Sequence, residues 1–280
     1  MSDAPTRIHI EPSRPASPRF SRPVAALTIA GSDSGGGAGI QADLRVFAAH
    51  GLLGCSAITA ITAQNTLGVR AWEPVSEHLV QAQIDAVLYD LPVTAMKTGM
   101  LGRAGLVRAV AASLVRGGRR LPLVVDPVMV STSGHRLLER DAEAALVDHI
   151  IPLATVLTPN LHEAAALSGL PLSAPPSDHL AALAAMAPQA FIIVKGGHRA
   201  GDVAATSAVD LVRSPSGKVV ELVAPWVETT STHGTGCSFS AAIASRLALS
   251  ESGSVREEDV MAGIVEARRY LAGALESAVP

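Results

Sequence analysis

The sequence predicts an α/β fold with a mostly parallel central sheet, helices on both faces of the sheet and an antiparallel edge hairpin. Three observations support this prediction. Short apolar runs alternate along the chain with longer segments of helical apolar spacing, which is the pattern of repeated β–α units. The runs are apolar at successive positions, as in parallel strands that are covered on both faces. Finally, the segment 206–224 places Ser-Pro-Ser-Gly between two strand-like runs, which indicates a hairpin.

The individual elements follow from the same patterns. Buried strands are expected at 24–30, 55–61, 121–125, 154–158 and 190–194. Helices are expected at about 39–50, 77–89, 103–116, 140–150, 160–168, 177–186, 236–249 and 256–275. Residues 1–23 combine prolines and arginines without apolar periodicity, so we expect a disordered tail there. No linker divides the remainder, which predicts one domain over 24–280.

Composition excludes several classes of protein. A chain of 280 residues that is 48% apolar and 17% charged can bury one sizeable core. The net charge of -3 provides no basic field for a nucleic-acid backbone, and no apolar stretch is long enough to span a membrane. Only two cysteines are present, too few for a disulfide framework and without zinc-ribbon spacing, so a cytoplasmic location is expected. Cys55 lies in an apolar strand and is assigned to core packing.

A glycine-rich loop follows the first predicted strand and runs from Gly31 to Gly39. Its spacing matches neither a dinucleotide fingerprint nor a P-loop. Such a backbone can approach a small flat ligand closely, with Asp33 and Asp43 as hydrogen-bonding carboxylates. The alternative is a tight turn that starts the next helix, with Asp43 merely solvated, and the glycines alone do not separate the two interpretations.

A second loop, Ser-Thr-His-Gly-Thr-Gly-Cys-Ser at 231–238, precedes another predicted helix. Its backbone amides would face outward from the positive helix end and stabilise anionic oxygens; they belong to Gly234, Thr235, Gly236 and Cys237. The same helix end is expected to lower the pKa of Cys237 and so help its thiolate take a proton from an alcohol. The alternative for an isolated cysteine is a small buried residue at a helix start.

Three charged residues stand at or just after the ends of predicted strands: Asp126, Glu163 and Lys195. Two carboxylates there could hold hydrated Mg²⁺, and the ammonium could contact a polyphosphate. Taken singly, Asp126 could cap a turn, Glu163 could be a first-turn helix acid and Lys195 a surface lysine. The loop histidines lack the spacing of a zinc helix, so no metal is assigned to them.

Taken together and in this order, the motifs closely resemble the hydroxymethylpyrimidine/phosphomethylpyrimidine kinase family, the thiamine-biosynthetic branch of the ribokinase-like superfamily. The resemblance covers nearly all of 24–275 and implies a ribokinase-like three-layer sandwich. It is carried by Ala26-Leu-Thr-Ile-Ala-Gly-Ser-Asp33, Gly39-Ile-Gln-Ala-Asp43, Ala63-Gln-Asn-Thr66, Lys97-Thr-Gly-Met100, Asp126-Pro-Val-Met129, Thr158-Pro-Asn160, Val194-Lys-Gly-Gly-His198 and Thr232-His-Gly-Thr-Gly-Cys237.

The resemblance implies a pyrimidine site. It places 4-amino-5-hydroxymethyl-2-methylpyrimidine near Gly31, Asp43, Gln64, Met100 and Val128, with Gln64 as the reader of the ring edge. A carboxamide suits this task because it can pair with both the donors and the acceptors of an aminopyrimidine. Without the resemblance, Gln64 would be a polar residue that closes a turn, and Met100 would be ordinary core packing.

The resemblance also implies the chemistry: ATP transfers its γ-phosphoryl group to the hydroxymethyl oxygen, and a second transfer converts the monophosphate to the diphosphate. Cys237 stands where related sugar kinases have an aspartate general base. Lys195 would contact the ATP phosphates, while Asp126 and Glu163 would orient Mg²⁺ through water. The family also implies a homodimer.

Other functions stay open at this point. A pyridoxal or pyridoxine kinase with a cysteine-type site would use the same fold and ATP site, and would differ only in the ring pocket. A catalytically silent binding protein is disfavoured because the charged residues and the glycine-cysteine turn are all retained. A nicotinamide-dependent oxidoreductase is excluded by the glycine spacing.

Overall fold

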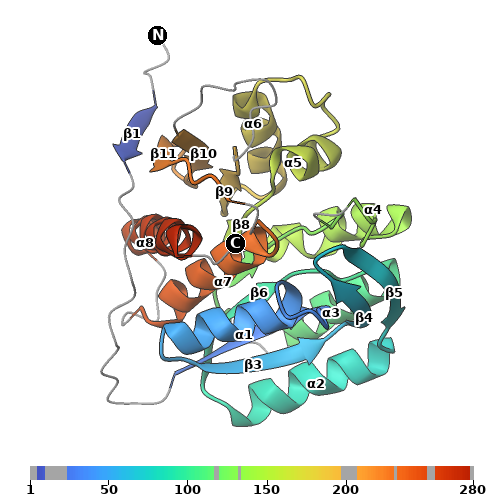
Figure 1. Cartoon of the computed structure of the whole chain (residues 1–280). Coiled ribbons are helices and arrows are strands. Elements are labelled where there is room, and N and C mark those ends of the chain that lie inside the picture. Colours follow the sequence, from blue (N-terminus) through green and yellow to red (C-terminus); the bar gives the residue numbers. More distant parts are fainter. Residues whose placement is uncertain are drawn as a thin grey trace.

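The architecture is a large sheet between two layers of helices (Figure 1). The computed structural model describes residues 5–9, 24–116, 120–131, 134–196, 207–229, 232–250 and 256–277. Within these residues, a nine-stranded sheet has the order β1-β11-β10-β9-β8-β7-β6-β2-β3, and β4 and β5 form a separate two-stranded sheet. None of the described helices combines the length and apolar character that a membrane span requires.

The strands run mainly in one direction. Their bounds are β1 Thr6–His9, β2 Ala25–Ala30, β3 Leu53–Ile58, β4 Ala60–Asn65, β5 Gly68–Pro74, β6 Val93–Thr98, β7 Leu123–Val125, β8 Val156–Leu157, β9 Phe191–Val194, β10 Ser207–Arg213 and β11 Val219–Pro225. Neighbouring strands from β3 to β9 are all parallel, so their carboxyl ends meet at one edge of the sheet. Ligands collect at this edge in open α/β sheets.

The helices form two layers with separate cores. Helices α1 (Gly39–Ala49), α7 (Thr235–Ala248) and α8 (Glu257–Glu276) lie next to one another on one face (Figure 1). The other face carries α2 (Glu77–Asp90), α3 (Ala104–Arg116), α4 (Arg140–His149), α5 (Leu161–Ser168) and α6 (Pro176–Met186), with a short 3₁₀ helix at Ile151–Leu153. Each layer buries its own apolar stripe against the sheet.

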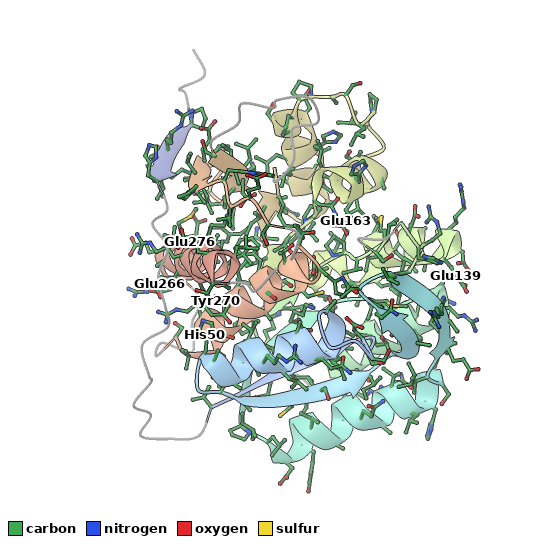
Figure 2. All side chains as sticks on the ribbon, viewed as in Figure 1. His50, Glu139, Glu163, Glu266, Tyr270 and Glu276 are labelled. Atoms are coloured by element: carbon green, nitrogen blue, oxygen red, sulfur yellow. The ribbon has the colours of Figure 1, made fainter. Side chains whose placement is uncertain are left out.

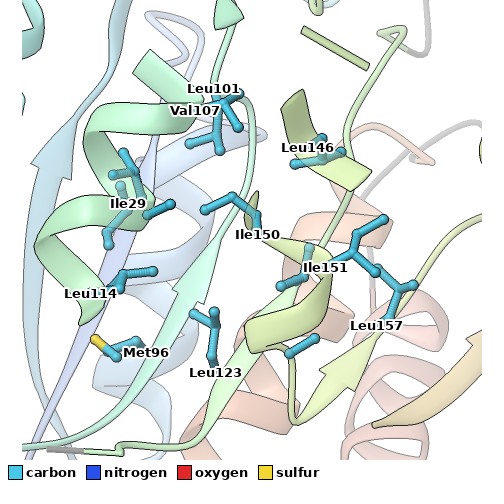
Figure 3. Packing of buried hydrophobic residues seen from close by; sticks show 14 of the residues in the cluster. Ile29, Met96, Leu101, Val107, Leu114, Leu123, Leu146, Ile150, Ile151 and Leu157 are labelled. Carbon is cyan, nitrogen blue, oxygen red and sulfur yellow. The ribbon is translucent and has the colours of Figure 1, made fainter. Parts of the chain in front are cut away.

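Alternate residues of one strand pack into different cores, because successive strand side chains point to opposite faces of the sheet. In β2, Leu27 and Ile29 pack towards α2 and α3, whereas Ala26 packs towards α1 and α7. Figure 3 shows the first core, in which Ile29 from the sheet and Leu146 from α4 are both buried. Strands buried on both faces explain why the sequence shows continuous apolar runs here.

The predicted α/β architecture is confirmed, with several local corrections. The expected strand at 55–61 divides into β3 and β4, and the strand at 93–98 was not predicted because Lys97 interrupts its apolar run. The hairpin β10–β11 is antiparallel as expected, yet it does not form the edge, since β1 pairs with β11 in parallel.

The disordered tail expected over 1–23 is wrong for Thr6–His9, which form β1. Ile8 packs on the α7–α8 core, and the Arg7 guanidinium lies 2.8 Å from a carboxylate oxygen of Glu221. The backbone groups of the β11 edge provide the remaining partners for this short strand. The other residues of that segment, 1–4 and 10–23, lie outside the described part of the chain.

Candidate active site

A cleft opens at the carboxyl edge of the sheet, where the loops after five strands meet the start of α7. The empty space within it is about 750 Å³ with the open mouth included. It brings together most of the predicted site residues: Gly31, Gln64, Met100, Asp126, Val128, Glu163, Lys195, Gly234, Gly236 and Cys237. Figure 2 labels Glu163, which belongs to the first turn of α5.

The glycine-rich loop folds back on itself at the N-terminus of α1. Gly39 has a φ of +56°, and a Cβ there would lie only 2.4 Å from the Gly31 carbonyl oxygen. The buried Asp33 carboxylate closes the loop by accepting backbone N–H groups from Gly35 at 2.9 Å and Ala38 at 2.8 Å. Burial opposes the charge of Asp33, but these bonds and one with His233 outweigh it and lower its pKa.

The first turn of α7 faces the same cleft. Gly234 is the N-cap residue with a φ of +78°, and a Cβ there would overlap the Gly37 carbonyl oxygen at 1.9 Å. Glycine is therefore required where the two loops touch. The N–H groups of a first helical turn have no partner within the helix, so this end of α7 can accept an anion.

Thr235 differs from its expected place in this turn. Its backbone N–H donates to the Thr232 carbonyl at 3.3 Å, and its hydroxyl donates to the same oxygen at 3.0 Å. Thr235 lines the two cavities beside the cleft and is not among the residues of the cleft itself. Without a bound ligand this amide has the Thr232 carbonyl as its acceptor, and its part in the anion-binding group stays a prediction.

Cys237 lies in the cleft, but the expected lowering of its pKa is wrong. Burial raises the pKa of the thiol to about 11, and the nearby Asp43 and Asp126 carboxylates add to this rise. The Lys97 ammonium and the Gly39 backbone N–H act in the opposite direction and are outweighed. The expectation from the sequence took only the helix end into account. The Asp43 and Asp126 carboxylates belong to segments that are distant from Cys237 in the sequence, so their effect on its pKa was not foreseen.

Asp126 and Lys195 form an ion pair on the floor of the cleft. Lys195 Nζ lies 3.1 Å from Asp126 Oδ1, and Ser240 on α7 donates to Oδ2 at 3.2 Å. Despite burial, which opposes ionisation, Lys195 and Lys97 lower the pKa of Asp126, while Asp126 raises the pKa of Lys195. Both groups are therefore charged at neutral pH.

Glu163 serves as a helix acid and also faces the cleft. It forms a capping box with Asn160: the Asn160 N–H donates to Glu163 Oε2 at 2.8 Å, and the Glu163 N–H donates to Asn160 Oδ1 at 2.9 Å. Burial, with the Asp126 charge as a smaller contribution, raises its pKa to about 7 against the opposing effect of Lys195. Both interpretations of this residue made from the sequence are thus compatible with the geometry.

Asp43 does not reach the cleft, which corrects its expected contact with a substrate. Its fully buried carboxylate accepts two hydrogen bonds from Lys97 Nζ, at 3.0 and 2.9 Å, and one from the Thr28 hydroxyl at 2.6 Å. Lys97 is also fully buried, yet it lines the cleft and was not assigned a role from the sequence. The available signal was a lysine in an apolar run, because a buried lysine requires a partner.

One wall of the cleft is apolar. Met100 and Val128 belong to a small cluster with Leu137 that includes residues of β4 and β5. A Cβ on Gly31 would lie 3.0 Å from Met100 Sδ, so the sulfur packs directly on this glycine. Gln64 adds the polar part of this wall, whereas Gly197 and His198 of the resembling motif lie outside the described residues.

Comparison with known proteins agrees with this geometry. The family model described as phosphomethylpyrimidine kinase matches residues 33–280. A hydroxymethylpyrimidine/phosphomethylpyrimidine kinase from Rhizobium meliloti is 48% identical over 258 residues, covering 90% of this chain and 91% of the relative.

Solved structures share the fold. Phosphomethylpyrimidine kinase from Clostridium difficile has a TM-score of 0.70 at 39% identity, covering 88% of this chain and 98% of that one. An ADP complex of pyridoxal kinase from Bacillus subtilis has a TM-score of 0.78 at 32% identity, covering 92% and 94%. With the sequence matches, these likenesses show that the chain belongs to the phosphomethylpyrimidine kinase family.

Proposed function

We propose that this protein phosphorylates 4-amino-5-hydroxymethyl-2-methylpyrimidine with ATP and then phosphorylates the monophosphate to the diphosphate. One observation carries the proposal: a single cleft holds the Asp126–Lys195 pair, Glu163 and the first turn of α7 with Cys237. The printed name of the Rhizobium meliloti relative covers both phosphorylations. The reaction would belong to thiamine biosynthesis.

The charges suit phosphoryl transfer, whose loose transition state is stabilised mainly by positioning and charge neutralisation. Lys195 supplies a positive charge on a side chain that is 16% exposed, and a Cβ on Gly236 would lie 3.2 Å from its Nζ. The ammonium therefore adjoins the first-turn amides of α7. On this proposal Lys195 binds the ATP phosphates, and the amides of Gly234, Gly236 and Cys237 hold the migrating group.

The carboxylates fit a magnesium ion. Mg²⁺ prefers oxygen ligands and keeps several waters, so Asp126 and Glu163 would hold it through hydration water rather than through a closed protein site. Burial raises the pKa of Glu163 to about 7, and a cation bound beside it would favour its ionised form. When bound, the ion would supply neutralisation of charge on the phosphate oxygens.

Cys237 would receive the proton of the substrate hydroxymethyl group. With a pKa of about 11 it is a thiol at neutral pH in the empty cleft, so only a small thiolate fraction can act as base. We therefore expect kcat/KM, which reports the pKa values of the free enzyme, to rise with pH between about 7 and 10. Lys97 assists, because its charge favours the thiolate.

Substitution tests this role. Cys237→Ala should lower kcat by about 10²- to 10⁴-fold while leaving pyrimidine binding largely intact. Cys237→Asp supplies a carboxylate base instead and should recover part of the loss without the alkaline rise. An unchanged kcat in Cys237→Ala would remove the thiol from the mechanism.

Product analysis tests the whole proposal. The protein is incubated with ATP, Mg²⁺ and hydroxymethylpyrimidine, and mass spectrometry resolves monophosphate from diphosphate. Both products are expected in sequence. Pyrimidine binding without ATP turnover would instead indicate a silent binding protein.

A pyridoxal kinase is the second candidate, and the Bacillus subtilis pyridoxal kinase favours it through its TM-score of 0.78. Parallel assays with pyridoxal separate the two, and a strong preference for pyridoxal would contradict our substrate assignment. We further propose a homodimer, as the family resemblance implies, and a cytoplasmic location, which the low cysteine content favours. Light scattering in solution measures the oligomeric state.

A further inference from the structure

His233 connects three segments that are distant in sequence. Its Nε2 lies 2.8 Å from Oδ2 of Asp33 in the glycine-rich loop and 3.3 Å from the side-chain amide of Gln64 in β4. The ring also packs on the glycine-rich loop, since a Cβ on Gly37 would lie 2.5 Å from His233 Cδ2. His233 directly precedes Gly234, the N-cap of α7.

The position of the imidazole proton follows from Asp33. Its Oδ2 already accepts the Ala38 N–H, its Oδ1 accepts the Gly35 N–H, and its lowered pKa keeps it ionised. An ionised carboxylate only accepts hydrogen bonds. The atom of His233 that faces it, Nε2, must therefore carry a hydrogen and donate it.

This hydrogen determines which end of the Gln64 carboxamide can face His233. The amide NH₂ group is a donor only, so NH₂ against Nε2–H would set two donors against each other. A turn of the carboxamide about its terminal bond brings the oxygen there instead, where it shares the Nε2 hydrogen with Asp33 in a three-centre hydrogen bond. The NH₂ group is then directed away from the imidazole, in a residue that lines the cleft.

The backbone of Gln64 is held by the same loop. The Ser34 hydroxyl donates to the Gln64 carbonyl at 2.6 Å, and the Gln64 N–H donates to the Ser34 oxygen at 2.8 Å. The pairing of β4 with β5 shifts register between Ala63 and Gln64, an irregularity that re-aims side chains. Ser34 therefore fixes the main chain of Gln64. The orientation of the carboxamide about its terminal bond is then set by His233.

We infer that His233 is a positioning residue that orients the Gln64 carboxamide, so that the cleft offers an oxygen acceptor beside an NH₂ donor to the ring edge. The inference rests on the proposed function. The 4-amino group of the pyrimidine can donate to the oxygen, whose second lone pair remains free, and the adjacent ring nitrogen can accept from NH₂. The 4-oxo analogue presents the opposite pattern, a carbonyl acceptor beside a ring N–H donor.

The test compares these two substrates, hydroxymethylpyrimidine and its 4-oxo analogue. In His233→Phe the carboxamide is free to turn, so the kcat/KM preference for the amino substrate should fall by about tenfold, the value of one neutral hydrogen bond. The change should appear mainly in KM, because Gln64 contacts the ring and not the phosphoryl group. His233→Gln keeps an N–H donor near the place of Nε2 and should retain the preference.

His149, exposed at the end of α4, provides the matched control, and His149→Phe should behave like the parent protein. An unchanged preference in His233→Phe would overturn the inference. Failure of the parent protein to phosphorylate the amino substrate would instead overturn the proposed function. If His233→Phe does not fold, ¹⁵N NMR of histidine-labelled parent protein decides: a hydrogen on Nε2 of His233 supports the inference, and one on Nδ1 alone contradicts it.

Discussion

At the scale of single residues, the buried charges of the cleft control one another. Asp126 keeps its charge because two lysines and the Ser240 hydroxyl compensate for burial, whereas Glu163 has too little compensation and its pKa rises to about 7. Cys237 stands at a helix start, but the nearby Asp43 and Asp126 carboxylates contribute to raising its pKa. The proton affinity of each group is therefore a property of the cluster.

The raised pKa of Glu163 predicts a pH-dependent stability. An unfolded glutamate titrates near 4.5, so between about pH 4.5 and 7 the folded state retains a proton that the unfolded state has lost. The free energy of unfolding should therefore decrease as the pH rises through this window. In Glu163→Gln this decrease should be smaller, because the amide cannot ionise and still completes the capping box.

Urea denaturation between pH 4.5 and 7.5, without nucleotide or Mg²⁺, measures the effect. Glu258→Gln changes an exposed first-turn residue of α8 and provides the control. The same pH slope in Glu163→Gln and in the parent protein would contradict the assignment.

At the scale of elements, a buried ion pair joins α8 to the loop that follows β9. Arg268 Nε on α8 donates to Asp210 Oδ2 on β10 at 2.8 Å, and Asp210 Oδ1 accepts the Gly196 N–H at 3.0 Å. Gly196 directly follows Lys195. The pair therefore holds the backbone beside the phosphate-binding lysine while both of its side chains are almost completely buried.

Arg268→Met leaves the Asp210 carboxylate buried without its partner and should reduce the free energy of unfolding by about 3–5 kcal/mol. The double variant Asp210→Asn with Arg268→Met removes both charges, and its free energy of unfolding should decrease less than that of the single variant. Urea denaturation and the KM for ATP measure the two consequences, and KM should rise in the single variant.

Arg256→Met, which breaks an exposed ion pair with Asp259, is the control. It should change the midpoint of urea denaturation little. A loss in Arg268→Met that is no greater than in this control would show that the buried pair does not hold the loop.

At the scale of the whole molecule, the sheet divides the protein into two cores and ends at β1. That strand covers the edge of β11, whose backbone groups would otherwise be open to a second chain. Exposed edges template intermolecular pairing. The strand Thr6–His9 therefore protects the sheet edge without contributing to the cleft.

Removal of residues 1–9 should leave the phosphorylation rate unchanged and increase association as the protein concentration rises. Light scattering across a concentration series measures this association, with kcat recorded in parallel. Arg7→Ala retains the backbone pairing and should behave like the full chain. Identical scattering by the truncated and full chains would contradict a protective role for β1.

Much of this protein is readable from its sequence. Apolar runs and helical spacing determine the α/β class, because strands buried on both faces cannot include many polar residues. Parallel strands bring their carboxyl ends to one edge, which explains why Asp126 and Lys195 were predicted together although 69 residues separate them.

Only the tertiary structure decided the electrostatics. The sequence does not show that Asp43 pairs with Lys97, that the pKa of Cys237 rises, or that His233 reaches Asp33 across 200 residues. Each of these depends on burial and on charges from distant segments, which the fold alone brings within a few ångströms. Local propensity has no term for such contacts, so residue roles could be proposed from the sequence but their protonation could not.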